Sequence, residues 1–555
     1  MQQKKDLPAY CLPNVHHQRN LFYFGSIEFN SDFDSGNMLK VERNHELLGL
    51  NFNIWIMPDA YLTQKEMKYK TWFHFSVQGV SKNTIINMTL KDINFQQKLY
   101  KDGHQPVFKS SVNNQWQRLD QNIANTIVQT ENGMDITFTY TFQDTDELVY
   151  FAFTYPWSYT DNQEMLDEIE NTYQFDKEIY FHRSVLVYSK EYRNVELITI
   201  TSSNSKSQDQ LKLQSKISFP QQKYPLFFPN KRYIFISTRV HPGEVPGSHV
   251  FNGMLKMLLD KQDIRSKNLR ENFVFVMIPL INPDGVSRGH YRTDSQGCNL
   301  NRFYINPGLD QPEIYSIKEL LMHLYDKGQL YCYMDLHAQA SKKGSFIYGN
   351  CMDYKSQIEC NLLTKLMALN TPYFEYELCN FTEKNMYSKD KSDGLSKEGA
   401  GRVALYKQTR NSLCYTLECN YNMPFNLNTM YSRSSNYDFK EGKFEIDQNI
   451  FNMISQSNGI EQKLCDYPYI SSHYANLGEG MLEAILDLNK INPISRIPNS
   501  PYKNYTTLKM QIAFQTMKQL PYRSVKDYSD VSSKSEDEDE QFKLIYNQLF
   551  KNNQY

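Results

Sequence analysis

His241 and Glu244 lie three residues apart, directly after an apolar segment in the middle of the chain. Residues 233–237 are mostly β-branched or aromatic, which predicts a buried strand. Pro242 and Gly243 predict a turn between the two polar side chains. Histidine and glutamate both bind Zn²⁺, and a catalytic zinc takes three protein ligands and keeps one position for water. The pair therefore predicts two zinc ligands at a strand end, where open α/β sheets bind their ligands.

A third ligand is predicted at the end of another apolar strand, at residues 329–336, which is followed by His337. Asp335 precedes it by two residues and is suited to holding the imidazole in one tautomer. Taken alone, a histidine at a strand end is more often a structural residue, and the H-x-x-E spacing is common by chance. Two such sets in one α/β domain predict a single zinc site made of His241, Glu244 and His337.

Arginines and a glutamate follow two further predicted strands. The strand at residues 272–281 leads into a loop that carries Arg288, Arg292 and Arg302. A guanidinium group can bind a carboxylate through two parallel hydrogen bonds or face a developing oxyanion, although solvated loop arginines explain the pattern equally well. The strand at 412–418 ends in Glu418, which could act as general base beside a zinc-activated water or could simply pair with an arginine.

The elements that would position these residues divide the chain of 555 residues into several parts, because this length is too great for one ordinary core. Residues 19–165 show short alternating segments, which predict an antiparallel β-sandwich domain. Strands and helices alternate over residues 166–490, which predicts a mixed, largely parallel sheet with helices on both faces. Residues 1–18 are predicted to be a flexible N-terminus. Residues 491–555 are predicted to be a C-terminal extension with an acidic, disordered tail.

Composition excludes several classes of protein. The net charge is −2 and the isoelectric point is near 6.6, which gives no overall attraction to nucleic acid or to membranes. Nine cysteines without a C-x-x-C pair argue against a disulfide framework and against a thiolate zinc site. The N-terminus lacks the apolar core of a signal peptide, and the longest apolar run, residues 273–281, is too short to cross a bilayer. We expect a soluble, intracellular protein.

Ordered segments across residues 22–488 resemble the zinc carboxypeptidases, and among them the cytosolic carboxypeptidases. The resemblance is greatest to the type-five branch, whose members remove branch-point glutamates from tubulin. The segments are FDSGNMLKVER (33–43), TWFHFSVQG (71–79), RVHPGEVPGSHVFNG (239–253), INPDGVSRGHYRTDSQGCNLNR (281–302), MDLHAQASKKGSFIYGN (334–350), NFTEKNMYSKDKSDGLSKEGAGRVALYK (380–407) and YTLECNYN (415–422).

The resemblance implies a role for each candidate residue. The three predicted zinc ligands match those of the family, which implies one zinc ion per chain, and Glu418 matches the catalytic base. Arg292 matches the arginine that polarises the scissile carbonyl group. Asn301 and Arg302 match the pair that holds the terminal carboxylate of the substrate. Arg402 has no role carried over from the family, and its charge and position suggest that it faces the acidic side chain of the terminal residue.

The resemblance also implies a function. We expect a zinc metallocarboxypeptidase that removes branch-point or C-terminal glutamates from polyglutamylated proteins, with glutamylated tubulin tails or other acidic C-termini as partners. A cytoplasmic location associated with microtubules or cilia is implied as well. Two alternatives remain open. An aspartoacylase-like deacylase of N-acyl amino acids uses the same zinc platform but lacks the N-terminal sandwich, and a non-catalytic microtubule-binding module would not need Glu418.

Overall fold

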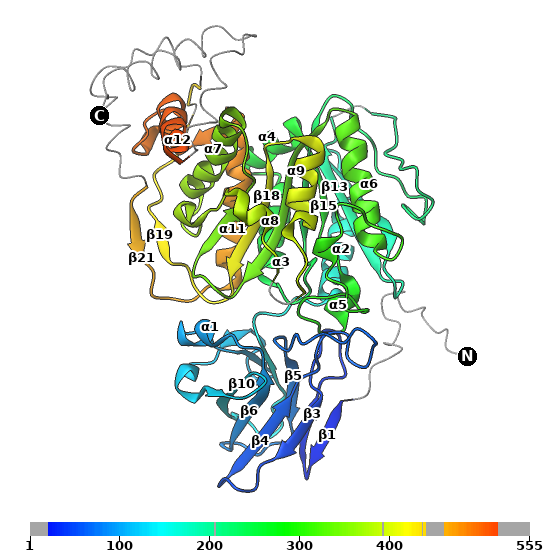
Figure 1. Ribbon diagram of the computed structural model, residues 1–555, viewed down its shortest axis with the longest axis vertical. Helices are drawn as coiled ribbons and strands as arrows, with labels where there is room; N and C mark the ends of the chain where they lie inside the picture. The colour runs from blue at the N-terminus through cyan, green and yellow to red at the C-terminus, as the bar shows by residue number, and fades with distance from the viewer. Residues whose placement is uncertain (1–19, 205–206, 391–392, 436, 440–459, 520–555) are drawn as a thin grey trace.

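The computed structural model describes residues 20–204, 207–390, 393–435, 437–439 and 460–519. Along its longest axis a β-sandwich, formed by the N-terminal part of the chain, lies against a larger body in which helices flank a sheet (Figure 1). The predicted flexible segment 1–18 and the acidic run 535–540 fall outside the described residues.

The N-terminal part forms two sheets that pack face to face. The first has the strand order β1 (Leu21–Phe24), β2 (Ile27–Asn30), β5 (His74–Gln78), β11 (Val149–Ala152), β7 (Val107–Ser110) and β8 (Gln117–Arg118). The second has the order β3 (Lys40–Arg43), β4 (Leu50–Trp55), β6 (Ile85–Ile93), β10 (Met134–Thr141) and β9 (Val128–Gln129). Aromatic rings join them: Phe29 of β2 lies 4.8 Å from Phe52 of β4, measured between ring centroids. The predicted sandwich is confirmed.

Three local features of the sandwich differ from the sequence-based prediction. Strands β4 and β6 pair in parallel, although their neighbours are antiparallel. The alternating segment at residues 21–29 predicts one strand, but Gly25 adopts a φ of 68° and turns the segment into the hairpin of β1 and β2. A short helix, α1 (Gln97–Lys101), lies in a stretch for which no helix was predicted. Each of these three features depends on a turn or on a choice of neighbouring strand, and alternating hydrophobicity predicts neither.

The larger body is built on a seven-stranded mixed sheet. Its order is β12 (Ile179–Tyr188), β13 (Asn194–Ser202), β15 (Phe273–Ile278), β14 (Arg232–Thr238), β16 (Leu330–Gln339), β18 (Cys414–Asn420) and β17 (Ser345–Tyr348). The four strands from β15 to β18 in this order are parallel, and the other three join antiparallel. All six residues of β15 are buried, as expected for a parallel strand covered on both faces. The predicted mixed α/β fold is confirmed.

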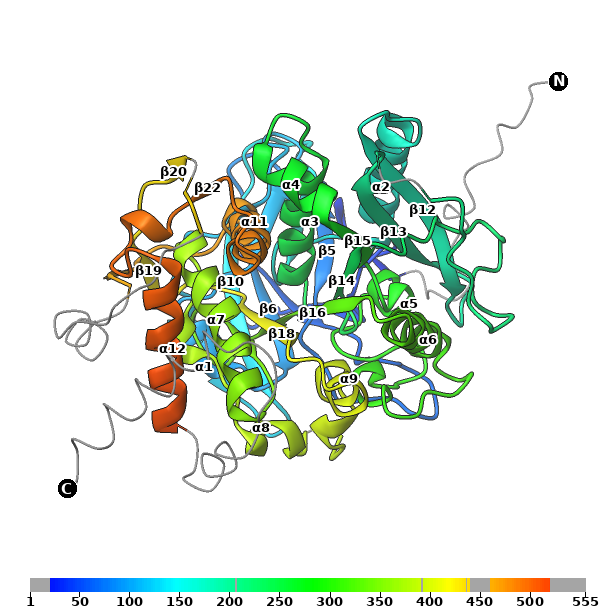
Figure 2. The same cartoon turned by 90° about the horizontal axis from the view of Figure 1, so that it is seen from above.

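Helices cover both faces of this sheet, with α3 and α11 on one face and α6 and α9 on the other (Figure 2). The longer helices are α2 (Tyr159–Tyr173), α3 (Pro246–Leu259), α4 (Ile264–Asn272), α6 (Pro312–Asp326), α7 (Tyr354–Asn370), α9 (Gly401–Thr409), α11 (Ser471–Leu488) and α12 (Tyr505–Gln519). Helix α12 packs against α7 in a stretch for which no helix was predicted. Within the described part of the chain, no helix combines the length and the apolar character needed to cross a bilayer.

The carboxyl ends of the central parallel strands face the sandwich. Tyr421, directly after β18, contacts Phe153 of the sandwich with 5.0 Å between ring centroids. Arg118 of β8 donates a hydrogen bond of 2.8 Å to the carbonyl of Tyr421. The edge of the sheet where the candidate residues lie is therefore also the edge that meets the N-terminal part.

Candidate metal centre and active site

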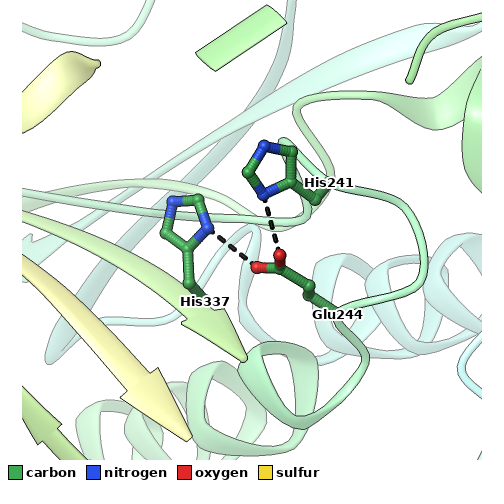
Figure 3. A group of neighbouring side chains, drawn as sticks. All are labelled: His241, Glu244 and His337. Carbon is green, nitrogen blue, oxygen red and sulfur yellow. Dashed lines mark hydrogen bonds and ion pairs between the residues drawn. The ribbon is translucent and has the colours of Figure 1, made fainter. Parts of the chain in front are cut away.

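The structure brings the three predicted zinc ligands together at the ends of β14 and β16. Nδ1 of His241 lies 2.8 Å from one carboxylate oxygen of Glu244, and Nδ1 of His337 lies 2.8 Å from the other (Figure 3). All three side chains are buried, and their ligand atoms lie within 4.8 Å of one another. The backbone N–H of Ala338 donates a hydrogen bond to the carboxylate of Glu244, which fixes its orientation.

The donor set fits Zn²⁺. His241 Nε2 lies 3.1 Å from Asn299 Oδ1, and His337 Nε2 lies 2.8 Å from Asp335 Oδ2, as predicted for Asp335. An oxygen acceptor at Nε2 places the ring hydrogen there and leaves the lone pair of Nδ1 for a metal ion. Burial lowers the pKa of His241 to about 4, so its ring is neutral at pH 7, as metal binding requires. The chain thus presents two imidazole nitrogens and a carboxylate on one centre.

A tight turn holds His241 and Glu244 in place. Gly243 donates its N–H to the carbonyl of Tyr291 at 2.8 Å, and a Cβ at this position would lie 2.5 Å from Tyr291 Cδ2. The buried guanidinium of Arg239 donates from Nε to the carbonyl of Pro242. Close packing against the loop after β15 therefore requires glycine between the two ligands.

Glu418 lies beside this centre on the neighbouring strand. In the register of β16 and β18, Glu418 is paired with His337, so the two side chains point to the same face of the sheet. The Glu418 side chain remains partly exposed. Burial raises the pKa of Glu418 to about 7, although the charge of His337 acts against the shift. A carboxylate with a pKa near 7 can take up a proton and release it again at neutral pH.

Two arginines beside the centre share one carboxylate. Arg292 Nη1 lies 3.8 Å from Glu244 Oε1, and Arg292 Nη2 lies 2.6 Å from Asp390 Oδ2. Arg302 Nη2 lies 2.8 Å from the same Asp390 oxygen. The Nε atoms of both arginines are buried and have no hydrogen-bond partner within the described structure. Each guanidinium has five N–H donors, so the two groups can bind a further carboxylate beside Asp390.

Asn301 and Arg402, the other predicted substrate-binding residues, lie next to this pair. Asn301 Oδ1 accepts a hydrogen bond from the N–H of Gly401, and Asn301 Nδ2 lies 3.3 Å from His337 Nε2. Arg402 lies in the first turn of α9, is 3% exposed, and donates from Nη1 to Asn350 Oδ1 at 3.0 Å. Burial lowers the pKa of Arg402 to about 10, which leaves it charged at pH 7.

Sequence reasoning missed several residues of the site. Asp390 lies within a segment that was used only for the resemblance, and so do Asp393, which accepts a hydrogen bond from Asn299 Nδ2, and Lys397. Lys397 Nζ lies 5.4 Å from the ring centroid of Tyr348, and burial lowers its pKa. Their spacing carried no signal, because their partners lie on other segments of the chain.

One predicted member of the pocket is directed elsewhere. Arg288 was expected beside the pocket with the other loop arginines, but its guanidinium pairs with Glu191, in the turn between β12 and β13. Arg193 binds the same glutamate and also Asp284 in α5 (Pro283–Ser287). Arg288 therefore belongs to a separate ion-pair cluster that holds α5 on the sheet.

Comparisons with known proteins match both parts of the chain. Residues 29–154 match the family described as cytosolic carboxypeptidase N-terminal domain, and residues 181–429 match zinc carboxypeptidase. Cytosolic carboxypeptidase-like protein 5 of Homo sapiens is 31% identical over 87% of this chain and 66% of its own length. The protein of the same name from Rattus norvegicus is 30% identical, with 87% and 70% covered. The chain thus spans about two thirds of the length of these relatives.

Solved structures share the fold. A metallo-carboxypeptidase from Burkholderia cenocepacia has a TM-score of 0.56 at 17% identity and covers 84% of this chain and 99% of its own. A metallo-carboxypeptidase from Pseudomonas aeruginosa, in complex with (2-guanidinoethylmercapto)succinic acid, has a TM-score of 0.54 at 17% identity and covers 83% and 98%. The two family matches lie in chain order on the sandwich and on the mixed sheet, and the second contains the metal centre. The chain belongs to the cytosolic carboxypeptidase family of zinc carboxypeptidases.

Proposed function

We propose that the protein is a zinc carboxypeptidase that removes glutamate, at a branch point or at a C-terminus, from polyglutamylated proteins such as tubulin. The observation that carries the proposal is the group of cationic side chains beside the metal centre. Arg292 and Arg302 share the carboxylate of Asp390, and Arg402 is a further buried cation of the same part of the chain. A terminal glutamate brings two carboxylates, so it can pair with two of these cations, whereas a neutral residue brings only its α-carboxylate.

Each of these cations has a distinct role in the proposed complex. The α-carboxylate of the substrate binds Arg302 and Asn301 and takes the place that Asp390 occupies beside the arginines. The side-chain carboxylate of the terminal glutamate is directed to Arg402 and Lys397. Arg402 is buried and Lys397 is partly buried, and a buried charge is stabilised by a partner of opposite charge.

Glu418 and Arg292 carry out the steps that belong to the chain itself. A zinc ion held by His241, Glu244 and His337 supplies Lewis-acid polarisation and lowers the pKa of water. Glu418 takes a proton from the attacking water and delivers it to the leaving amine, a cycle for which a pKa near 7 is suited. Arg292 donates hydrogen bonds to the carbonyl oxygen as negative charge develops on it.

Mass spectrometry of branched and linear glutamylated tubulin peptides, incubated with purified protein, tests the proposal. We expect loss of glutamate with the wild type and a turnover lower by about 10²–10⁴ with Glu418→Gln, because general-base assistance has this size. The variant should keep stoichiometric zinc. Glu375→Gln serves as a control, since Glu375 is a buried carboxylate that binds the backbone N–H of Asn426 away from the site.

The outcomes separate the alternatives. Near-normal turnover by Glu418→Gln would contradict the mechanism. Hydrolysis of N-acyl amino acids without cleavage of peptides would favour a deacylase, and sedimentation with microtubules by a zinc-loaded but inactive protein would favour a binding module. Cleavage of the branch glutamate alone would assign the type-five specificity. Under the proposal the partners are glutamylated tubulin tails or other acidic C-termini, in the cytoplasm on microtubules or cilia.

A further inference from the structure

Asp59, a residue of the N-terminal sandwich, binds three consecutive backbone N–H groups of the loop that carries Arg292. Its Oδ1 accepts from the N–H of Tyr291 at 2.7 Å, and its Oδ2 accepts from the N–H groups of Arg292 at 2.7 Å and Thr293 at 2.8 Å. The hydroxyl of Thr293 donates to Oδ2 as well, at 3.2 Å. Asp59 is 1% exposed, so these bonds are made away from water, where they are strong.

Asp59 is itself firmly placed within the sandwich. It lies in the segment between β4 and β5, where its N–H donates to the carbonyl of Tyr69 and its carbonyl accepts from Met67. The adjacent residue, Ala60, donates its N–H to His290 Nε2 at 3.2 Å. The loop after α5, by contrast, has no strand or helix between residues 289 and 299. The geometry of its backbone at residues 291–293 is therefore set from the sandwich.

The same segment of the sandwich also contacts the side chain of Arg292. The guanidinium carbon of Arg292 lies 5.9 Å from the ring centroid of Tyr69, within the range of a cation–π interaction. One segment thus holds the backbone of Arg292 through Asp59 and one side of its guanidinium through Tyr69. From there the guanidinium reaches to 3.8 Å from Glu244.

We infer that Asp59 is a positioning residue for the reaction, and that the N-terminal sandwich completes the active site by fixing the peptide units that aim Arg292 at the substrate carbonyl. This inference rests on the role of Arg292 in the proposed function. Asp59 touches neither substrate nor metal, and it acts through Arg292. A donor to a developing oxyanion is effective only when it is held in place beforehand, and a misplacement of 1 Å can cost a factor of about 10² in rate.

The first test replaces Asp59 by asparagine. An amide offers one oxygen in place of two, so at least one of the three N–H groups loses its acceptor. We expect kcat to fall by about 10²-fold while KM changes little, because Arg302 and Asn301 remain in place to bind the substrate. Hydrogen exchange at the amides of residues 291–293 should become faster. Unchanged exchange at these amides would overturn the inference whatever the substrate.

A matched control separates positioning from loss of stability. Asp135 is a buried carboxylate of the same sandwich, and it accepts the backbone N–H of Asp92 and pairs with Lys91, remote from the loop. Asp135→Asn should lower the melting temperature and leave kcat within about twofold of the wild type at a temperature where both are folded. An equal loss of kcat in Asp59→Asn and Asp135→Asn would show that Asp59 only stabilises the fold.

A double-mutant cycle decides whether Asp59 acts through Arg292. If it does, Asp59→Asn combined with Arg292→Ala has a kcat within about twofold of Arg292→Ala alone. If the two effects multiply, the inference is wrong. Thr293→Val removes only the hydroxyl donor and should lower kcat in the same direction by less, which provides a second variant should Asp59→Asn not fold. A wild type that cleaves no glutamylated peptide contradicts the proposed function instead, and the exchange measurement still decides on Asp59.

Discussion

Asp390 places one carboxylate between Arg292 and Arg302, so the two guanidinium groups share it as a counter-charge. Burial lowers the pKa of Arg302, and the charge of Arg292 adds to this effect. Asp390 relieves the repulsion only in part. A substrate carboxylate that arrives here gains two arginines but must first displace Asp390 or share them with it.

We therefore expect Asp390→Asn to lower the KM for a glutamylated peptide severalfold, with little change in kcat, because the substrate then competes with a neutral amide. Initial-rate kinetics provide the measurement. Glu383→Gln, at an exposed position on α8 (Glu383–Tyr387), changes the net charge equally and should leave KM within about twofold. A higher KM for Asp390→Asn would show that Asp390 mainly orients the two arginines for the substrate.

The residues of the site that could be predicted from the sequence share one property. His241, His337 and Glu418 each lie at or just past the end of an apolar strand, and the carboxyl ends of parallel strands meet at one edge of a sheet. Asp390 and Asp59 were missed because what identifies them is their partners: Asp390 is 98 residues from Arg292, and Asp59 is 233 residues from it. For a polar residue on a long loop, the sequence does not identify the partner, which only the fold brings into contact.

At the scale of elements, the turn between β14 and α3 carries two of the three metal ligands and packs against the loop after β15. Gly243→Ala would bring a Cβ to 2.5 Å from Tyr291 Cδ2, closer than such contacts occur, so the turn must shift. We expect zinc content after dialysis to fall well below one ion per chain, measured by atomic absorption. Gly308→Ala, where the nearest atom is 3.8 Å away, should keep its zinc. Full zinc occupancy in Gly243→Ala would contradict the rigidity of the turn.

The central strands and their helices could be predicted because each is long and strongly patterned. The strand predicted at residues 233–237 is found as β14 (Arg232–Thr238), and the alternation of strands and helices predicted over residues 166–490 continues with α3 (Pro246–Leu259). The parallel pairing of β4 and β6 could not be predicted, since alternation reports which face is buried and not which strand is the neighbour. Helix α12 lacks a clear apolar stripe, and its place depends on packing against α7.

At the scale of the whole molecule, the sandwich and the mixed sheet share polar and aromatic contacts at the active-site edge. Arg118 donates to the carbonyls of Tyr421 and Tyr469, and the ring of Phe153 packs on Tyr421. Asn37 in the sandwich donates to the carbonyl of Gly289. Contacts of this number at buried positions favour joint unfolding of the two parts, because separation would leave buried donors without acceptors.

Stability should depend on pH through Glu313 at the start of α6. Burial raises its pKa to about 8, with Asp284 and Asp294 adding to the shift and Lys190 opposing it. The unfolded chain has a glutamate pKa of about 4.3, so the folded state binds this proton more tightly. The stabilisation is complete below about pH 4 and is lost as the pH rises through about 8.

We therefore expect the melting temperature to be higher at pH 6 than at pH 8.5, and Glu313→Gln to reduce that difference, measured by differential scanning calorimetry in matched buffers. Glu319 lies on the same helix, but its carboxylate is bonded to Ser215 and Ser218, so Glu319→Gln should keep the difference in melting temperature between pH 6 and pH 8.5. If Glu313→Gln shows the pH dependence of the wild type, Glu313 is already ionised in the folded protein.

Asp390 also sets a threshold for which anions can enter the site. A tethered group competes as if it were present at an effective concentration on the order of millimolar or more, whereas a free ligand competes only at its own concentration. A small monocarboxylate offers one weak contact and would lose this competition unless it were present at a comparable concentration. A polyglutamylated tail brings several carboxylates on one chain, so that release of one leaves others poised to rebind. The internal carboxylate would thereby make the site respond to the multivalency of a substrate more than to its charge alone.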